Sequence, residues 1–261
     1  MAETQTTTGP ETESRTPERT VLEIAGPERL EFLQDLVTND ISDPDRLTYA
    51  ALLSPQGKYL ADFFVAHDAG RLLIDAPSPV APGLLMRLRM YRLRRKLDIE
   101  GTDLSVATGD GPPPEGAHAD PRHPALGWRQ IGGQGNDTRD RDALRVAHMI
   151  PAAGAELVAD DSYILEMGFE RLHGVDFRKG CYVGQEVTAR MKHKTELRKG
   201  LAQVSVSGDA SPGDEITAGG KPVGRLQTRA GDQALAYLRY DRAQGEMEAG
   251  SARLSLLQRG N

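Results

Sequence analysis

The single cysteine of the chain, Cys181, lies in residues 179–186, Lys-Gly-Cys-Tyr-Val-Gly-Gln-Glu. A lone thiol forms no internal disulfide, and it falls short of the several thiolates that a zinc or iron–sulfur site normally takes from one protein. Lys179 and the arginine before it stand next to the thiol, and a nearby cation favours the reactive thiolate. Gly180 and Gly184 bracket the thiol and allow a ligand to approach the backbone closely. These residues indicate a reactive cysteine, and the alternative is a small, buried one, which is common.

This octapeptide and the four residues after it, Val-Thr-Ala-Arg, resemble the signature of the YgfZ family. Members of that family are folate-binding relatives of the glycine-cleavage T-protein (aminomethyltransferase) that assist the maturation of iron–sulfur proteins. The resemblance covers roughly residues 20–258, nearly the whole of the chain. Further matching segments are residues 32–34, 38–41, 51–58, 145–147, 150–151, 223–226 and 234–238.

The resemblance implies an α+β, T-protein-like folate-binding fold with a central ligand cleft and a small C-terminal antiparallel β-barrel. We expect residues 19–199 to form the folate-binding region, as two intertwined α+β subdomains of about 19–108 and 109–199, and residues 200–261 to form the barrel. The pattern itself agrees. Hairpins and helices without regular βαβ alternation favour α+β, and short strands between Gly, Pro and Asp turns follow Gly200.

The resemblance also implies a function. Cys181 is expected to act as a thiolate that transiently contacts a cluster, a sulfur species or a partner protein of the iron–sulfur assembly machinery, and Lys179 to activate it. Tetrahydrofolate or a derivative is the implied cofactor. Four of its implied contacts, Asn39, Asp62, Glu166 and Arg190, could equally be turn or surface residues. The implied cofactor-binding and loop-shaping residues are Asn39, Asp62, Glu166, Gly180, Tyr182, Gly184, Gln185, Glu186 and Arg190.

A second hypothesis is a tetrahydrofolate-dependent aminomethyltransferase. T-proteins place a catalytic acid a few residues after the third strand, and the corresponding position here falls near Pro82, where no carboxylate stands. Without a group to handle the proton, transfer would lose a factor of roughly 10²–10⁴. Classical aminomethyltransferase activity is therefore not expected.

A third hypothesis, an RNA-binding or tRNA-modification accessory protein, rests on charge. The chain carries −6 overall, but residues 178–199 hold seven Lys/Arg against two Glu, and residues 87–96 hold six Lys/Arg without an acid. Such islands suit an anionic partner or are ordinary solvated faces. Because aromatic residues are not interleaved with the cations, nucleic acid is not the expected partner.

Composition also suggests a location. Residues 1–18 are rich in Thr, Glu, Pro and Ser and are expected to form a disordered tail. They contain no apolar signal core, and their acids argue against a mitochondrial transit peptide. One cysteine suits a reducing compartment. We therefore expect a cytoplasmic monomer without a membrane span, and the scattered histidines predict no metal site.

The periodicity predicts the elements that position the loop. Strands are expected over residues 20–25, 47–53, 58–67, 71–75 and 97–108. Helices are expected over residues 82–96, 140–148, 160–173 and 185–194, the last with its N-terminal end facing the cysteine loop.

Overall fold

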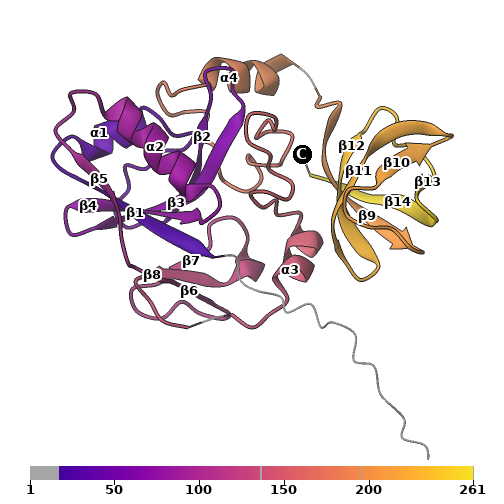
Figure 1. The fold of residues 1–261 in the computed structure, drawn as a ribbon, viewed down its shortest axis with the longest axis horizontal. Helices are drawn as coiled ribbons and strands as arrows, with labels where there is room; N and C mark the ends of the chain where they lie inside the picture. The colour runs from indigo at the N-terminus through magenta and orange to yellow at the C-terminus, as the bar shows by residue number, and fades with distance from the viewer. Residues whose placement is uncertain (1–17, 136, 195, 261) are drawn as a thin grey trace, which may run out of the picture.

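The first sheet forms one side of the molecule (Figure 1). The computed structural model describes residues 18–135, 137–194 and 196–260, so the tail predicted for residues 1–18 lies outside them except for Glu18. The sheet is antiparallel in the order β2-β3-β4-β1-β5. Its strands are β1 (Arg19–Ala25), β2 (Thr48–Leu53), β3 (Tyr59–Asp68), β4 (Arg71–Pro77) and β5 (Asp98–Gly101). The first four confirm the predicted strands.

Both faces of this sheet are covered. Helices α1 (Arg29–Gln34) and α2 (Ala81–Arg92) pack on one face, where Phe63 and Val65 of β3 join their apolar side chains. The alternate residues of β3, Phe64 and Ala66, face the other way and pack against the segment that leads to the cysteine loop. Period-two alternation with two apolar faces explains why β2 and most of β3 are buried throughout.

A small second sheet follows, with the order β6-β8-β7. Its strands are β6 (Val106–Gly109), β7 (His118–Ala119) and β8 (Trp128–Ile131), and helix α3 (Arg141–His148) comes next. The single strand predicted over residues 97–108 is therefore wrong. Thr102 ends β5 by donating its backbone N–H and its hydroxyl to the Val21 carbonyl, at 2.9 and 3.0 Å. The chain therefore passes from the first sheet to the second between the end of β5 and the start of β6, inside the segment that was predicted to be one strand.

The helix predicted over residues 160–173 is also wrong. This segment forms two single turns, each ended by a residue with positive φ, Gly168 (+77°) and His173 (+54°). Phe169 N–H bonds to the Ile164 carbonyl at 3.1 Å, and Gly174 N–H bonds to the Phe169 carbonyl at 2.7 Å, as in a Schellman motif. Gly168, a glycine inside the helical pattern, was the sequence signal that a helix would end there.

The C-terminal region is a closed antiparallel barrel (Figure 1), as predicted. Its strand order is β10-β11-β12-β9-β14-β13, and the pairing of Thr217 with Glu248 closes it. Its strands are β9 (Lys199–Ser207), β10 (Glu215–Ala218), β11 (Lys221–Ala230), β12 (Gln233–Arg239), β13 (Met247–Ala249) and β14 (Ala252–Arg259). Helix α4 (Gln185–Lys194), which confirms the predicted helix, leads from the cysteine loop toward the barrel (Figure 1).

Candidate functional site: the Cys181 loop and the central pocket

The thiol of Cys181 is exposed to solvent just before helix α4. The next side chain, Tyr182, points inward and is only 7% exposed, within the core that backs the first sheet. Burial raises the pKa of the Tyr182 phenol, so the ring stays neutral. A buried anchor thus stands next to an exposed sulfur, and the alternative of a buried cysteine is excluded.

Lys179 fixes the other side of the loop. Its ammonium donates to the backbone carbonyls of Gln34 (2.7 Å), Val37 (2.5 Å) and Asn39 (3.2 Å), at the C-terminal end of α1 and just beyond it. Burial lowers the pKa of this ammonium to about 8. The contacts make Lys179 a tether between the loop and the first sheet's helical layer, a role that the sequence did not suggest.

Gly184 and Gly180, the two glycines of the loop, differ in their surroundings. Gly184 has φ +84°, and a Cβ there would lie 2.7 Å from the Ser54 carbonyl oxygen and 3.1 Å from Cα of Gly57. Gly180 has no atom within 4 Å of the place a Cβ would take, among the described residues. The loop therefore requires glycine at position 184 for packing, whereas Gly180 leaves open space beside Cys181.

Asn39 and its neighbour Thr38 hold the approach to the loop. The Asn39 side-chain amide donates to the carbonyls of Tyr49 (2.8 Å) and His173 (2.7 Å), and its oxygen accepts the Asp40 N–H. Thr38 donates its hydroxyl to the Gly174 carbonyl at 2.7 Å. These buried bonds join strand β2 to the chain that precedes Cys181, so Asn39 helps to position the loop.

Three further predicted site residues lie on the first turns of α4. Gln185 places its amide nitrogen 3.4 Å from the Gly180 carbonyl oxygen, which is a weak contact across the loop. Glu186 and Arg190 are exposed, and no ion pair is formed by either within the described residues. The side chains of this helix therefore leave the surroundings of the thiol open to solvent.

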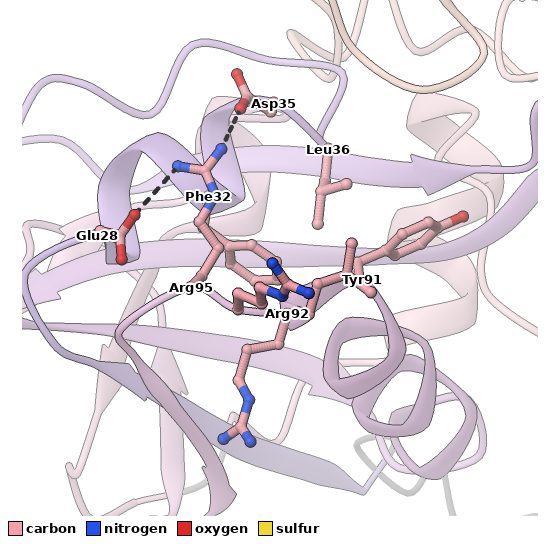
Figure 2. Close-up of a pocket in the computed structure, with 9 residues that line it drawn as sticks. Glu28, Phe32, Asp35, Leu36, Tyr91, Arg92 and Arg95 are labelled. Atoms are coloured by element: carbon pink, nitrogen blue, oxygen red, sulfur yellow. Dashed lines mark hydrogen bonds and ion pairs between the residues drawn. The ribbon is translucent and has the colours of Figure 1, made fainter.

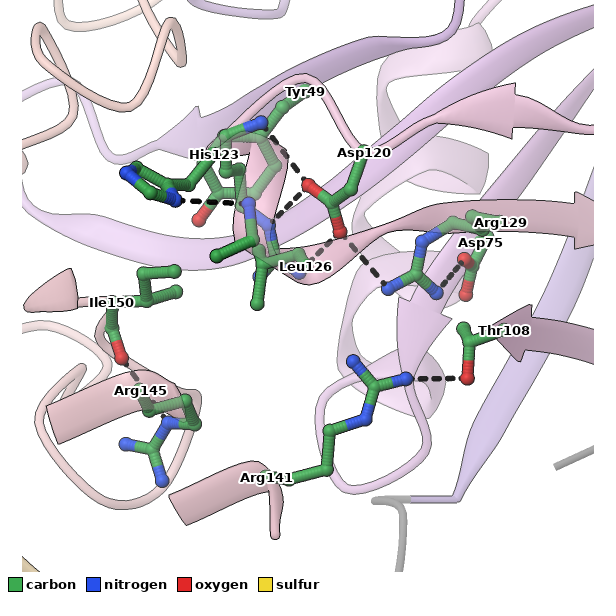
Figure 3. Close-up of polar contacts among 12 residues, drawn as sticks. Tyr49, Asp75, Thr108, Asp120, His123, Leu126, Arg129, Arg141, Arg145 and Ile150 are labelled. Carbon is green, nitrogen blue, oxygen red and sulfur yellow. Dashed lines mark hydrogen bonds and ion pairs between the residues drawn. The ribbon is translucent and has the colours of Figure 1, made fainter. Parts of the chain in front are cut away.

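A separate pocket of about 120 Å³ lies where the two sheets and α3 meet. Figure 3 shows arginine side chains from β8 and α3 around this space. Apolar residues such as Leu126 and Ile150 form the rest of the wall, and Asp62 is the carboxylate among the lining residues. The lining arginines are Arg19, Arg122, Arg129, Arg141 and Arg145.

Buried carboxylates form ion pairs with three of these arginines. Asp75 is fully buried and accepts from Arg19 at 2.5 Å and from Arg129 at 2.7 Å. Burial alone would raise the pKa of Asp75, but the two guanidinium groups outweigh it and hold the pKa below its usual value. Asp120 similarly pairs with Arg122 at 2.7 Å. Burial lowers the pKa of Arg129 to about 10, which leaves it charged at neutral pH.

Asp62 is the one of the four implied folate contacts that lines the pocket. Its two oxygens accept hydrogen bonds from the hydroxyls of Tyr59 (2.7 Å) and Tyr49 (3.0 Å). Burial, followed by the Asp62 charge, raises the pKa of both phenols, so both remain donors. Each carboxylate oxygen keeps a further lone pair that could accept a ligand N–H.

Glu166 lies elsewhere, at the contact between the turn segment and the barrel. It accepts from the Tyr237 hydroxyl at 2.5 Å and lies 3.8 Å from the Lys199 ammonium. Its backbone carbonyl accepts the Leu201 N–H at 2.7 Å. The structure thus brings residues 179–186 and Asn39 together and leaves Asp62, Glu166 and Arg190 in three other places.

The arginine–carboxylate cluster was missed from the sequence because its members come from separate strands and loops. The motif Asp120-Pro-Arg122 was one signal, since a carboxylate two residues from an arginine in a tight turn can pair locally, as it does here at 2.7 Å. Residues 18–135, 137–194 and 196–260 contain no group of three His, Cys, Asp or Glu that could hold a metal ion. Over the same ranges, no helix is long and apolar enough to cross a membrane.

The sequence of this chain is similar to those of known proteins. The iron-sulfur cluster assembly factor IBA57 of Homo sapiens is 30% identical over 276 aligned residues, which cover 88% of this chain and 78% of the relative. The IBA57 homolog of Mycosarcoma maydis is 31% identical over 229 residues, 74% of this chain and 56% of the relative. The chain therefore spans little more than half of that fungal protein.

Two further comparisons concern the fold. A family model described as the C-terminal beta-barrel domain of CAF17 matches residues 198–259. The crystal structure of the glycine cleavage system aminomethyltransferase T from Bartonella henselae superposes with a TM-score of 0.71 at 11% identity, covering 91% of this chain and 82% of that one. The T-protein-like α+β fold with a C-terminal barrel is therefore confirmed.

These relatives correct one prediction. Both IBA57 proteins described above are named as mitochondrial. The predicted cytoplasmic location is thus contradicted. It relied on the composition of residues 1–18, and the lack of a recognisable targeting signal there does not determine a compartment.

Proposed function

Because the chain belongs to the family of the iron-sulfur cluster assembly factor IBA57, we propose that it is an accessory protein of iron–sulfur cluster assembly or repair, acting through Cys181. One observation carries the proposal: the sulfur is exposed, while Lys179 and Tyr182 on either side are held to the protein body. A loop that is held in place and carries an exposed thiol suits a cysteine that must contact an iron–sulfur cluster carried by a partner protein.

The number of thiolates limits what Cys181 can do. Iron–sulfur clusters are usually held by four cysteine thiolates, and this chain has one. Cys181 therefore supplies one ligand to a cluster whose remaining ligands come from a partner protein. On binding iron the thiol gives its proton to solvent, because the thiolate is the metal ligand. The protein would then act as a transient co-ligand during transfer.

The test compares Cys181→Ser with Gly180→Ala, which alters the neighbouring position where there is room for a methyl group. In a strain that lacks this protein, Cys181→Ser should fold normally and fail to restore iron–sulfur enzyme activity, while Gly180→Ala should restore it. Full rescue by Cys181→Ser would show that the thiol is dispensable and would end the proposal.

We further propose that the central pocket binds part of a folate. The chemistry of its wall fits: Asp62 can accept from the N–H groups of a pterin, apolar side chains can cover the ring, and the arginines suit carboxylates. The volume of about 120 Å³ is below the roughly 300–1,000 Å³ of ordinary ligand sites, so it suits the ring rather than the whole molecule.

The folate proposal is tested by thermal unfolding. Tetrahydrofolate should raise the melting temperature, and a polyglutamylated form should raise it more at low salt. No shift with either ligand at millimolar concentration would reject folate binding without touching the role of Cys181.

Aminomethyl transfer should be absent. In the segment where a catalytic acid is expected, Asp75 is engaged by Arg19 and Arg129, and Pro82 lies exposed at the start of α2. Neither can take up a proton from a folate amine at neutral pH. Turnover of an aminomethyl-lipoyl carrier with tetrahydrofolate at an ordinary enzyme rate would contradict this.

A further inference from the structure

Helix α2 carries an unusual outer face. Five large apolar side chains are strongly exposed in the described ranges, and three of them are Met86 (60%), Met90 (68%) and Leu93 (84%). The i, i+4 spacing of Met86 and Met90 places them on one side of the helix, and Leu93 follows its last residue, Arg92. The opposite side is buried through Leu84 and Leu88. Helix α2 is therefore apolar on both sides, and packing within the chain explains only the buried one.

Leu93 is held out by a strained backbone. It has φ 47° and ψ −110°, and the carbonyl of Arg92 accepts the N–H of Arg95 at 2.9 Å. Leu93 is thus the first central residue of a type II′ turn, a position that glycine dominates. A side chain there strains the backbone. The fold tolerates a strained residue whose side chain contributes little to the core.

A groove adjoins Leu93, which is the one of these three apolar residues that lines it. It has a volume of about 790 Å³ and lies between α1 and the C-terminal turn of α2. Its apolar lining comes from Phe32, Leu36, Tyr91 and Leu93. Figure 2 shows Arg95 between Glu28 and Asp35 at one end of this groove.

The charge around this surface is incompletely compensated. Residues 87–96 hold six cations and no acid. Arg95 pairs with three carboxylates of α1 and its flanks. Arg87 and Arg92 form longer ion pairs with Asp160 (3.9 Å) and Asp98 (3.4 Å). Within the described residues, Arg89, Arg94 and Lys96 form no ion pair, and Arg89 donates only to the Ile99 carbonyl. Three exposed cations thus border an exposed apolar stripe.

We infer that this stripe and groove form a docking surface for an acidic amphipathic helix of a partner protein. The apolar face of such a helix would cover Met86, Met90 and Leu93, and its carboxylates would meet Arg89 and Arg94. Methionine side chains adapt to irregular apolar partners, and grooves of this kind accept helices. A helix can fill the groove, whereas a flat membrane surface would leave the groove empty.

Other occupants fit less well. Residues 1–17 contain Met1 and Ala2 as their only aliphatic residues apart from prolines, too few to cover the stripe. In a symmetric dimer through this face the cations of the two copies would oppose one another. A separate partner with acidic flanks avoids both problems.

The surface is continuous with the proposed site. Asp35 and Leu36 line the groove, and the carbonyls of Gln34 and Val37 on either side of them accept from Lys179. A partner seated in the groove would therefore lie against the chain segment that holds the Cys181 loop. This inference rests on the proposed function for its biological sense, but its test reads binding alone.

The test uses a fluorescent, helix-stapled peptide with leucines at i, i+4, i+7 and i+11 and glutamates elsewhere. Its controls are a scrambled peptide of the same composition and one with lysine in place of glutamate. We expect the acidic helix to bind the full chain, with an affinity that falls as salt increases. Equal binding of the scrambled or the lysine peptide would overturn the inference.

Three variants locate the contact. Leu93→Gly suits the turn, so it should leave the melting temperature unchanged or higher and weaken peptide binding at least tenfold. Arg89→Gln with Arg94→Gln should weaken binding and reduce its salt dependence. Leu257→Ser, at an exposed leucine on the barrel, should change nothing. Equal loss in Leu257→Ser and Leu93→Gly would refute the site.

The competing occupants are distinguished in the same series. Sedimentation of the unliganded chain that revealed a dimer, lost in Leu93→Gly, would replace the partner by a second copy. Binding to phosphatidylglycerol vesicles without binding to the peptide would replace it by a membrane. Cys181→Ser should bind the peptide normally, so that failure of docking and failure of the thiol's role remain separate results.

Discussion

Gly57, in the turn between β2 and β3, and Gly184, before α4, lie in backbone contact. A Cβ on Gly184 would come within 3.1 Å of Cα of Gly57, and a Cβ on Gly57 would come within 3.4 Å of the Gly184 carbonyl oxygen and 2.8 Å of the Val187 Cβ. Both glycines also have positive φ, +73° and +84°. The hairpin and the cysteine loop therefore approach so closely that there is no room for a side chain at position 57 or 184.

This contact predicts different effects for the two glycines of the loop. Gly184→Ala should lower the free energy of unfolding by about 1–3 kcal/mol, because it adds strain at positive φ and displaces the hairpin. It should also impair rescue in the deletion strain. Gly180→Ala should be close to neutral in both measurements, since the site is open. Equal destabilisation of the two variants by urea denaturation would contradict the packing argument.

Lys179 provides a second prediction, because a tether and an activating charge have different consequences. Lys179→Ala removes the donor to three carbonyls and should cost about 1–3 kcal/mol. Arg178→Ala removes an adjacent cation whose side chain is 93% exposed, and should leave stability unchanged. If Lys179 acts as a tether, rescue should fall in Lys179→Ala and persist in Arg178→Ala. Comparable slowing of Cys181 alkylation by both variants, without loss of stability, would favour charge instead.

The sequence predicted the parts of the molecule that are specified locally. The strand pattern of β1 to β4, helix α4 and the small barrel follow from alternation, periodicity and turn residues, and all are present. The loop around Cys181 was identified from eight consecutive residues. Two predictions failed, the single strand over residues 97–108 and the helix over residues 160–173. The helix failed because Ile164, Met167 and Phe169 are buried on every side and Gly168 ends the turn.

The central cluster could not be predicted in the same way. Arg19 comes from β1, Asp75 from β4 and Arg129 from β8, and each is the single member of the cluster that its strand supplies. Their ion pairs depend on how two sheets meet, which no local pattern encodes. For the same reason Lys179 was interpreted as an activating charge: its three carbonyl partners lie about 140 residues earlier in the chain.

A third prediction concerns Asp75 and pH. Asp75→Asn leaves Arg19 without its buried counter-charge and leaves Arg129 with Asp120 alone, 3.6 Å away, and should cost about 3–5 kcal/mol at pH 7. Because the pKa of Asp75 is lowered in the fold, the unfolded chain binds its proton first as pH falls. Its contribution is therefore present above about pH 4 and lost below it. Denaturation at pH 7 and pH 3 should show a larger loss in the wild type than in Asp75→Asn. Parallel loss in both would contradict this assignment.

The last prediction separates the implied folate contacts by their positions. Asp62 lines the central pocket, whereas Arg190 is exposed on α4 and Asn39 is bonded to the backbone near the loop. If folate binds in the pocket, Asp62→Asn should reduce the tetrahydrofolate-induced rise in melting temperature, because an amide is a poorer acceptor for pterin N–H groups.

Arg190→Ala should leave that rise intact. Asn39→Ala should lower the melting temperature of the free protein, since it removes two buried hydrogen bonds, and yet preserve the increment due to the ligand. Isothermal titration with tetrahydrofolate would check the same order of affinities. Loss of the increment in Arg190→Ala, with Asp62→Asn unaffected, would move the ligand from the pocket to α4, beside the Cys181 loop.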